Sequence, residues 1–191
     1  MPIAIILLGP QGSGKGTVAS EFIGRGYNPV IMGDLIRKNQ TDPSVVNNGG
    51  LASDESVAEL FESAVKILRA QGKDFVLDGC IRTNNQVHMV INKLPRYDLR
   101  FFLLDCSLAT CLSRIAGRKD KHRATGLPER EDDKDIATIK RRISLFRSNI
   151  SSIIFEIEKH KGLKVHTVSA ENSVDEVVSC IDGLMSTMCS R

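Results

Sequence analysis

Short continuous apolar runs alternate along the chain with longer segments whose apolar residues recur every three or four positions. The runs predict buried strands at Ile3–Leu8, Phe75–Leu77, Arg100–Leu104 and Leu163–Val168. The recurring pattern predicts helices over Lys15–Arg25, Asp54–Ala70, Asn84–Lys93, Ser107–Arg118, Asp132–His160 and Val174–Met188. Apolar strands separated by helices indicate an α/β fold, with a parallel sheet covered by helices on both faces.

Two stretches interrupt this alternation. Residues 39–53 contain two adjacent asparagines and two adjacent glycines, and residues 117–131 are charged and carry Gly and Pro. Both compositions predict mobile surface segments. A length of 191 residues predicts one domain with mobile subparts.

Composition narrows the setting of the protein. No apolar run approaches the roughly 20 residues that span a bilayer, and the apolar N-terminus lacks the basic region of a signal peptide. Five cysteines without a C-x-x-C pair predict free thiols in a reducing compartment, so we expect a cytoplasmic protein. The four histidines form no ligand-spaced cluster with the cysteines, so we expect no structural zinc.

Charge is unevenly distributed along the chain. The net charge is +3, yet residues 114–147 hold 11 Lys/Arg and 6 Asp/Glu, a local net of +5. Residues 114–142, which hold all but one of these cations, contain no Phe, Tyr or Trp to stack on bases, so we do not expect a nucleic acid partner.

A glycine-rich motif follows the first predicted strand and opens the first helix, where residues 9–17 read GPQGSGKGT. Glycines let the backbone curl so that successive N–H groups point at phosphate oxygens, and the helix N-terminus adds positive potential. The motif predicts a nucleotide-binding loop in which Lys15 reaches the β- and γ-phosphates. Its members are Gly12, Ser13, Gly14, Lys15, Gly16 and Thr17.

The lysine of a generic phosphate loop is followed directly by Ser or Thr. Here Gly16 intervenes, and the hydroxyl is on Thr17. This form resembles the loop of adenylate kinases and related nucleoside monophosphate kinases. The resemblance implies the P-loop nucleoside monophosphate kinase fold, with a second site facing the loop for an acceptor nucleotide.

Further segments resemble the acceptor site of that family. Residues 33–37 (GDLIR) match a run that presents an arginine to the acceptor phosphate, and residues 77–86 (LDGCIRTNNQ) resemble L-D-G-F-P-R-T-x-x-Q. The second match implies Arg82 on the acceptor phosphate, Gln86 on the base edge, and Asp78 on Mg²⁺ through water. The acceptor site is thus assigned to Met32, Arg37, Gly50, Leu51, Ala52, Gly79, Arg82 and Gln86.

Two departures from the family pattern bear on the acceptor. Met32 stands where adenylate kinases usually carry Thr, and Cys80-Ile81 replaces Phe-Pro, which removes a rigid bend ahead of Arg82. Gln86 can both donate to and accept from a purine edge, which favours adenine. We therefore expect AMP as the acceptor, and Met32 keeps UMP or CMP as the alternative.

The basic segment resembles the arginine clamp of the family, in which preorganised cations stabilise the phosphoryl group in flight. Arg114 and Arg118 are four residues apart, on one helix face, and resemble the pair at the lid entrance that contacts ATP. Arg130 lies in REDD, which resembles R-x-D-D at the lid exit. Near the C-terminus, the resemblance places backbone groups around Asn172 on the ATP adenine.

Arg141 and Arg142 compete for the last catalytic arginine, which the family carries in I-x-x-R-[LI]. At 100° per residue, Arg142 lies about 75° from the centre of the apolar stripe and Arg141 points nearly opposite. The helical phase and the match of residues 139–143 to this pattern both select Arg142. The segment between Arg130 and Arg142 is then one residue longer than in the family pattern, so neighbours of Arg130 stay alternatives for the arginine at the lid exit. The catalytic set is Lys15, Arg118, Arg130 and Arg142.

Only 11 residues separate Arg118 from Arg130, too few for a hairpin or zinc-bearing lid, so the resemblance implies a short-lid form. We expect one kinase domain spanning residues 1–191. Its parts are a core of residues 1–29, 62–113 and 132–191, an acceptor-nucleotide-binding subdomain of residues 30–61 and a short lid of residues 114–131.

The resemblance implies Mg²⁺-dependent transfer of the γ-phosphoryl group of ATP to AMP, giving two ADP, by a monomer with nucleotide substrates and no membrane partner. A phosphate-loop GTPase would need a D-x-x-G switch, and no Asp in the chain has Gly three residues later. It would also need an N-K-x-D base reader, but Asn92-Lys93 is followed by Leu94-Pro95. A nucleotide-binding regulatory protein without kinase activity is the alternative from another class.

Overall fold

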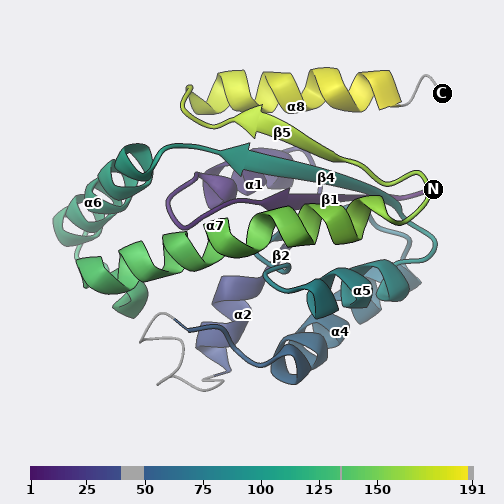
Figure 1. Cartoon of the computed structure of the whole chain (residues 1–191), viewed down its shortest axis with the longest axis horizontal. Helices are drawn as coiled ribbons and strands as arrows, with labels where there is room; N and C mark the ends of the chain where they lie inside the picture. Colours follow the sequence, from purple (N-terminus) through teal and green to yellow (C-terminus); the bar gives the residue numbers. More distant parts are fainter. Residues whose placement is uncertain (40–49, 134, 189–191) are drawn as a thin grey trace.

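A computed structural model describes residues 1–39, 50–133 and 135–188, and the main chain but not the side chain of Glu131. Five parallel strands form one sheet in the order β2-β3-β1-β4-β5. In chain order they are β1 (Ile3–Leu8), β2 (Asn28–Ile31), β3 (Phe75–Asp78), β4 (Asp98–Asp105) and β5 (Val165–Ser169). The α/β fold predicted from the apolar pattern is confirmed (Figure 1).

Helices connect the strands and cover both faces of the sheet (Figure 1). They are α1 (Lys15–Gly24), α2 (Met32–Lys38), α4 (Asp54–Ala70), α5 (Asn84–Lys93), α6 (Leu108–Ala124), the short 3₁₀ helix η1 (Glu131–Asp133), α7 (Ile136–Glu158) and α8 (Val174–Met188). Helices α4, α5 and α8 have the bounds that their apolar spacing predicts.

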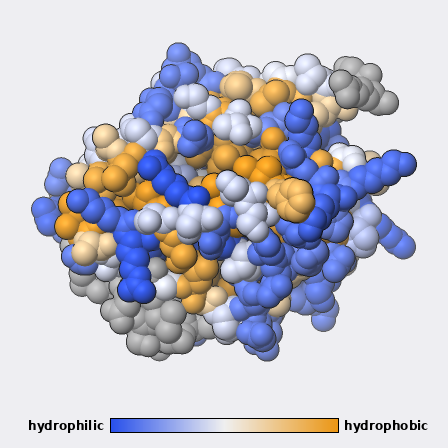
Figure 2. Space-filling view, viewed as in Figure 1, coloured by the Kyte–Doolittle hydropathy of each residue, from blue (hydrophilic) through white to orange (hydrophobic). Residues whose placement is uncertain are grey.

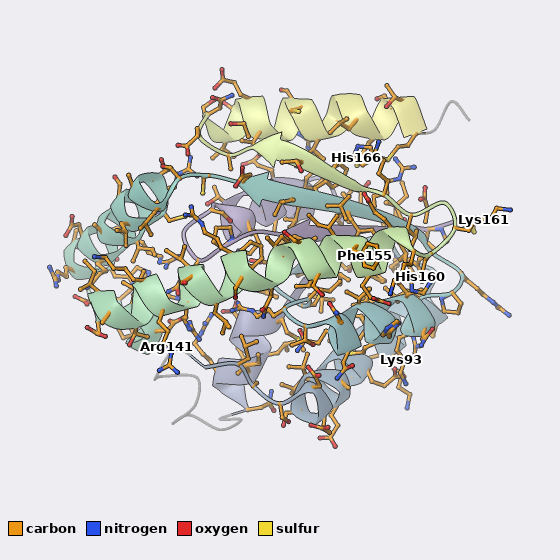
Figure 3. The ribbon with its side chains drawn as sticks, in the orientation of Figure 1. Lys93, Arg141, Phe155, His160, Lys161 and His166 are labelled. Atoms are coloured by element: carbon orange, nitrogen blue, oxygen red, sulfur yellow. The ribbon has the colours of Figure 1, made fainter. Side chains whose placement is uncertain are left out.

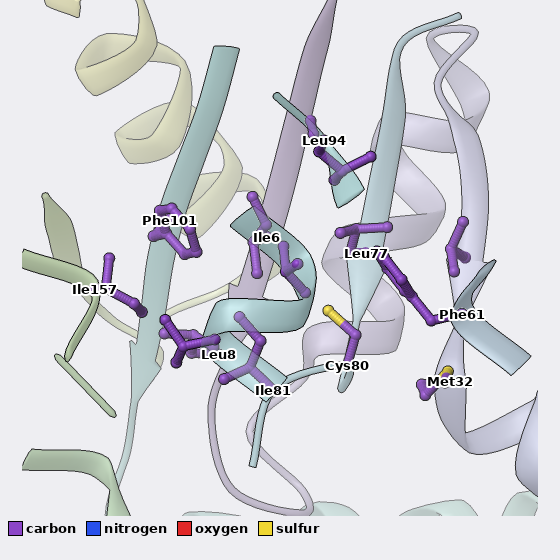
Figure 4. Packing of buried hydrophobic residues seen from close by; sticks show 14 of the residues in the cluster. Ile6, Leu8, Met32, Phe61, Leu77, Cys80, Ile81, Leu94, Phe101 and Ile157 are labelled. Carbon is purple, nitrogen blue, oxygen red and sulfur yellow. The ribbon is translucent and has the colours of Figure 1, made fainter. Parts of the chain in front are cut away.

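Alternate residues of each central strand enter different halves of the core. In β1, Ile6 packs with α4, α5 and the carboxyl end of α7, whereas Ile5 packs with α1, α8 and the start of α7. Side chains of a strand point alternately to the two sheet faces, so a strand buried on both faces must be apolar throughout. Figure 4 shows the first half of the core, where Ile6, Leu77 and Phe101 meet side chains of the surrounding helices.

The sequence pattern missed β2, a four-residue strand that reads NPVI at the edge of the sheet. Proline cannot donate a ladder hydrogen bond and is tolerated in edge strands. Asn28 Nδ2 donates to Asp74 O at 3.0 Å, which helps to align β2 with β3. The strand leads directly into α2, so its end places Met32 and Arg37 beside the end of β3.

The helix end predicted at Arg118 is wrong, because α6 continues to Ala124 and includes Gly117, although most of residues 117–130 are exposed, as predicted for this surface stretch. A glycine inside a helix costs about 1 kcal/mol but does not end it. The helix ends at Ala124, and Gly126 just beyond it has a φ of 69°, which allows Leu127 N to donate to His122 O at 3.0 Å. Most of residues 39–53, the other predicted surface stretch, lies outside the described residues.

Helix α7 begins four residues later than predicted, at Ile136. The carboxylate of Asp135 accepts hydrogen bonds from the N–H groups of Ala137 at 3.2 Å and Thr138 at 2.8 Å. A side chain that caps the first turn in this way fixes the start of a helix. Residues 131–133 ahead of it form η1 instead of the first turn of α7.

On the face that carries α7, apolar side chains are visible near the middle and hydrophilic ones surround them (Figure 2). None of the helices in the described ranges is both long enough and apolar enough to cross a bilayer.

Candidate active site

The phosphate loop joins the end of β1 to the start of α1. Gly12 and Gly14 adopt φ angles of 86° and 94°, which side-chain-bearing residues rarely adopt. A Cβ atom on Gly12 would lie 2.5 Å from the carbonyl oxygen of Cys111, in the first turn of α6. The loop therefore rests on the backbone of α6, and only glycine fits at that contact.

Lys15 is held inside the loop by main-chain acceptors. Its ammonium donates to Gly9 O at 2.7 Å and to Pro10 O at 2.9 Å. Burial lowers the pKa of Lys15 from 10.5 to about 8, and the Asp78 carboxylate partly opposes this shift. A buried ammonium at the start of a helix is suited to bind an anion, because the attraction of a negative charge replaces the hydration that the ammonium loses on burial.

Hard oxygen donors lie beside the loop. Asp78 ends β3, next to β1 in the sheet, and its Oδ2 is 3.6 Å from the position of a Cβ on Gly16. Thr17, one residue further, is exposed. A carboxylate and a hydroxyl that can act directly or through water are the donors that Mg²⁺ prefers, so these residues fit that ion.

A single pocket brings together every residue that the sequence assigns to the acceptor site. It has an empty volume of about 490 Å³, open solvent included. Its lining comprises Met32, Gly33, Ile36, Arg37, Gly50, Leu51, Ala52, Val57, Gly79, Arg82, Gln86, Asp132 and Arg142. One part of this lining is apolar and the other carries guanidinium groups, as expected of a site for a planar, anionic ligand.

The charged part of the acceptor pocket holds more positive than negative groups. Arg142 pairs with the buried carboxylate of Asp132, and Arg37 Nη1 lies 4.0 Å from the same Oδ2 atom. Burial, and next the charge of Arg142, lower the pKa of Arg82. Burial opposes the shift at Asp132, yet the guanidinium groups of Arg142, Arg130 and Arg37 hold its pKa below the ordinary value.

Known proteins are similar in sequence to this chain over nearly its whole length. A family model described as an AAA domain matches residues 5–137. Adenylate kinase 1 of Drosophila melanogaster is 32% identical over 195 residues, which cover 95% of this chain and 80% of that protein. The adenylate kinase of Parasynechococcus marenigrum (strain WH8102) is 30% identical over 97% of this chain and 100% of its own. The chain belongs to the adenylate kinase family.

Another relative has a different name. UMP-CMP kinase 1 of Oryza sativa subsp. japonica is 27% identical over 96% of this chain and 74% of its own length. The chain is thus similar to kinases named for different acceptor nucleotides.

The departure from the adenylate kinase pattern ahead of Arg82 is accommodated by packing. Cys80 and Ile81 are 1% and 2% exposed and lie in the core between Leu8 and Met32 (Figure 4). The main chain of Arg82 is fixed on both sides, because its N–H donates to Gln86 Oε1 at 2.7 Å and its carbonyl accepts from Asn149 Nδ2 at 3.4 Å. These contacts fix the main chain at Arg82 without a proline before it.

Gln86, predicted to face the acceptor base, is 2% exposed and its amide is engaged within the protein. Its Nε2 donates to Asp54 Oδ1 at 2.9 Å. Asp54 also accepts from Thr83 Oγ1 at 2.9 Å and from Asn85 Nδ2 at 2.8 Å. Asp54 thereby ties the start of α4 to the start of α5, a role that its position next to a helix cap did not reveal.

The two arginines assigned to the lid entrance have different partners. Arg114 donates to Ser13 O and to Asn172 O, both at 3.2 Å, so it bridges the phosphate loop and the loop before α8. Arg118 makes a bidentate pair with Asp133, through Nε at 2.9 Å and Nη2 at 2.8 Å. Gln11 Nε2 donates to the same carboxylate at 2.6 Å, which links the phosphate loop to η1.

Sequence reasoning missed Asp132 and Asp133 as site residues. Both are buried, at 8% and 1% exposure, and each holds an arginine assigned to catalysis. The only sequence signal for these two carboxylates was their place beside Arg130 in the motif REDD. Arg130 itself has a different neighbour, because its Nη2 lies 3.8 Å from Asp34 Oδ1. A sequence motif shows the carboxylates but not which arginines reach them.

Helix α7 turns Arg142 into the acceptor pocket and leaves Arg141 exposed (Figure 3). The side chain of Arg142 is 9% exposed. This placement agrees with the helical phase that selected Arg142.

The contact of Gly12 with α6 predicts the effect of adding one methyl group. Gly12→Ala should lower the free energy of unfolding by about 1–3 kcal/mol, because the new Cβ meets a main-chain oxygen that cannot move alone. Gly117→Ala, in α6 with open space around its Cα, should raise it by about 0.5–1 kcal/mol. Urea unfolding of both variants measures the difference, and a Gly12→Ala variant as stable as the parent would contradict the close approach.

Proposed function

We propose that this chain catalyses Mg²⁺-dependent transfer of the γ-phosphoryl group of ATP to AMP, giving two ADP. The observation that carries the proposal is the acceptor pocket. Arg37, Arg82 and Arg142 line it together with one carboxylate, Asp132, so its described charges leave an excess of two positive charges. A phosphate monoester carries about −1.5 to −2 at neutral pH, which matches that excess.

The apolar part of the same pocket supports a nucleotide rather than inorganic phosphate. Met32, Ile36, Leu51 and Val57 offer a surface on which a base and ribose can pack, while the guanidinium groups bind the phosphate. We assign acceptor binding to Met32, Arg37, Gly50, Leu51, Ala52, Gly79, Arg82 and Gln86.

On the donor side, we assign ATP to the phosphate loop. The N–H groups of residues 12–17 and the Lys15 ammonium bind the β- and γ-phosphates. Arg114 and the main chain around Asn172 form the border of the donor site. The hydrogen bonds that join Arg114 to Ser13 of the phosphate loop and to Asn172 support this assignment. Asp78 and Thr17 would hold Mg²⁺, which neutralises phosphate charge when bound.

Catalysis in this proposal is positional and electrostatic. Lys15, Arg118, Arg130 and Arg142 surround the phosphoryl group, whose negative charge is spread over three oxygens in the transition state. Asp132 and Asp133 hold Arg142 and Arg118 in place before the nucleotides bind, so little reorganisation is needed during the reaction.

We further propose that residues 30–61 act as an acceptor-binding subdomain and residues 114–131 as a short lid around a core of residues 1–29, 62–113 and 132–191. The lid excludes water when it closes over ATP. The protein acts as a cytoplasmic monomer on free nucleotides, without a nucleic acid or membrane partner and with Mg²⁺ as the only ion of the reaction.

Turnover with a panel of acceptors tests the proposal. With ATP and Mg²⁺, AMP should give a kcat/KM at least about tenfold above UMP, CMP and GMP, because binding groups in the pocket discriminate between bases. Preference for UMP or CMP would support the pyrimidine nucleotide kinase alternative, which Met32 and the similarity to the UMP-CMP kinase 1 of Oryza sativa favour. Saturable ATP binding without turnover of any acceptor would instead support a regulatory nucleotide-binding protein.

Substitution of the paired arginines of α7 tests the assignment of Arg142. Arg142→Gln should lower kcat by about 10²–10³-fold, because one charge-stabilising donor is lost from the transition state. Arg141→Gln, one residue earlier and exposed, should stay within about twofold of the parent by the same steady-state assay. Equal losses in both variants would contradict the assignment, and thermal unfolding of each controls for damage to the fold.

The lowered pKa of Lys15 predicts how ATP affinity depends on pH. Below a pKa of about 8 the ammonium is mostly protonated in the unbound protein, so the dissociation constant should rise only about twofold from pH 7 to 8. Above it, binding must take up a proton, and the dissociation constant should rise up to about tenfold per pH unit. The Lys15→Arg variant keeps its positive charge to high pH, so its dissociation constant for ATP, measured by calorimetric titration, should not show this rise. The same increase with pH in the variant would contradict the assignment of Lys15 to the ATP phosphates.

A further inference from the structure

A cluster of nitrogen and carboxylate groups lies where α5 passes the carboxyl end of α7. His88 comes from α5, Glu156 from the last turn of α7, and His160 from the turn just beyond it. His88 Nε2 lies 3.3 Å from Glu156 Oε1, and one ligand atom from each residue falls within 4.8 Å of the other two. The histidine ring centroids are 5.8 Å apart.

The backbone explains why these residues meet. Glu156 and His160 are four positions apart, so they share one helix face, and His160 N donates to Ile157 O at 3.1 Å, which continues the turn past the end of α7. Figure 3 shows His160 at this end of α7, beside α5. His88 reaches the same place from α5.

We propose that His88, Glu156 and His160 bind one divalent transition metal ion, with Zn²⁺ as the best match. This proposal departs from the sequence expectation of no zinc, which considered the histidines only together with the cysteines. Two imidazole nitrogens and a carboxylate oxygen form a common protein ligand set for Zn²⁺, at about 2.0–2.2 Å from the ion, with water in the fourth position. Ligand atoms of a tetrahedral site are roughly 3.3–3.5 Å apart. The side chain of His88 is 48% exposed and can rotate to close the remaining gap.

A neighbouring cation leaves the required oxygen available. Lys159 Nζ donates to Glu156 Oε2 at 2.9 Å, whereas Oε1 is the atom directed at His88. The carboxylate can therefore keep its lysine partner and still contribute one oxygen to the ion. Nitrogen ligands favour Zn²⁺, Cu²⁺ or Ni²⁺ over Mg²⁺, so this site would not compete for the ion that accompanies ATP.

The position of the cluster suggests what a bound ion does. Polar contacts join α5 and the residues before it to one side of α7, along what we term the α5–α7 seam. They are Asn149 Nδ2 to Arg82 O at 3.4 Å, Asn84 Nδ2 to Ser152 Oγ at 2.8 Å, and His88 Nε2 to Glu156 Oε1 at 3.3 Å. The seam begins at Arg82, in the acceptor pocket, and ends at the cluster, so an ion there would clamp the end remote from the pocket.

Zinc titration of the full chain tests the site. Protein stripped with a chelator and free of nucleotide, which itself binds zinc, is titrated with ZnCl₂ by calorimetry. The parent protein and every variant of it carry Cys180→Ser and Cys189→Ser. Cys180 is an exposed thiol that could bind zinc on its own, and Cys189 is replaced as well because it lies outside the described residues. One ion per chain should bind with a dissociation constant in the micromolar range, and saturating zinc should raise Tm by about 3 °C or more.

Single substitutions then identify the ligands. His88→Gln, Glu156→Gln and His160→Gln should each weaken zinc binding by about tenfold or more. His122→Gln, a half-buried histidine of α6 outside the cluster, should not change it. X-ray absorption of the zinc-loaded protein should show two imidazole ligands. Absence of saturable binding, or binding that persists unchanged in both His88→Gln and His160→Gln, would overturn the proposal.

Discussion

Positive charge crowded around two buried carboxylates is the constraint on which the rest of the site depends. Two like charges roughly 4 Å apart interact with about 4 kcal/mol at the effective dielectric constant of ~20 found in proteins. A domain is stable by only about 5–15 kcal/mol in all. Arg37 and Arg142 can therefore share a pocket without a ligand because Asp132 lies between them and Asp34 pairs with Arg37, and Asp133 pairs with Arg118 in the same way. A bound phosphate would relieve the charge that remains.

The parallel sheet delivers these groups to one edge. The carboxyl ends of its strands all face the same side, so β1 ends at the phosphate loop, β3 at Asp78 and β2 at Met32. The other two strands contribute through contacts with that loop, because Cys111 beyond β4 supports Gly12 and Asn172 beyond β5 shares Arg114 with Ser13. Residues distant in sequence thus converge without any long connection crossing the site.

The sequence predicted what periodicity and local motifs encode, and missed what depends on tertiary distance. Strand β1 and helices α4, α5 and α8 carry clear apolar patterns, and their bounds match. Strand β2 is too short for a pattern, and the helix predicted to end at Arg118 continues as α6 to Ala124. All eight acceptor residues line one pocket because their motifs fix local spacing. The carboxylates that hold them, among them Asp54 and Asp132, are paired with residues 10 to 95 positions away, a separation that no local pattern reports.

One extra residue between Arg130 and the last arginine, relative to the family pattern, shows how the fold absorbs a change in length. Each added residue would turn a helix by about 100° and carry the arginine out of the pocket if it entered α7. In this chain η1 and the Asp135 cap lie between Arg130 and the first turn of α7, so the cap sets where the helix begins. Arg142 then keeps its phase with the buried Ile139 and Ile143, and reaches Asp132. The phase of the arginine relative to the apolar stripe, rather than its distance along the chain from Arg130, is what the site requires.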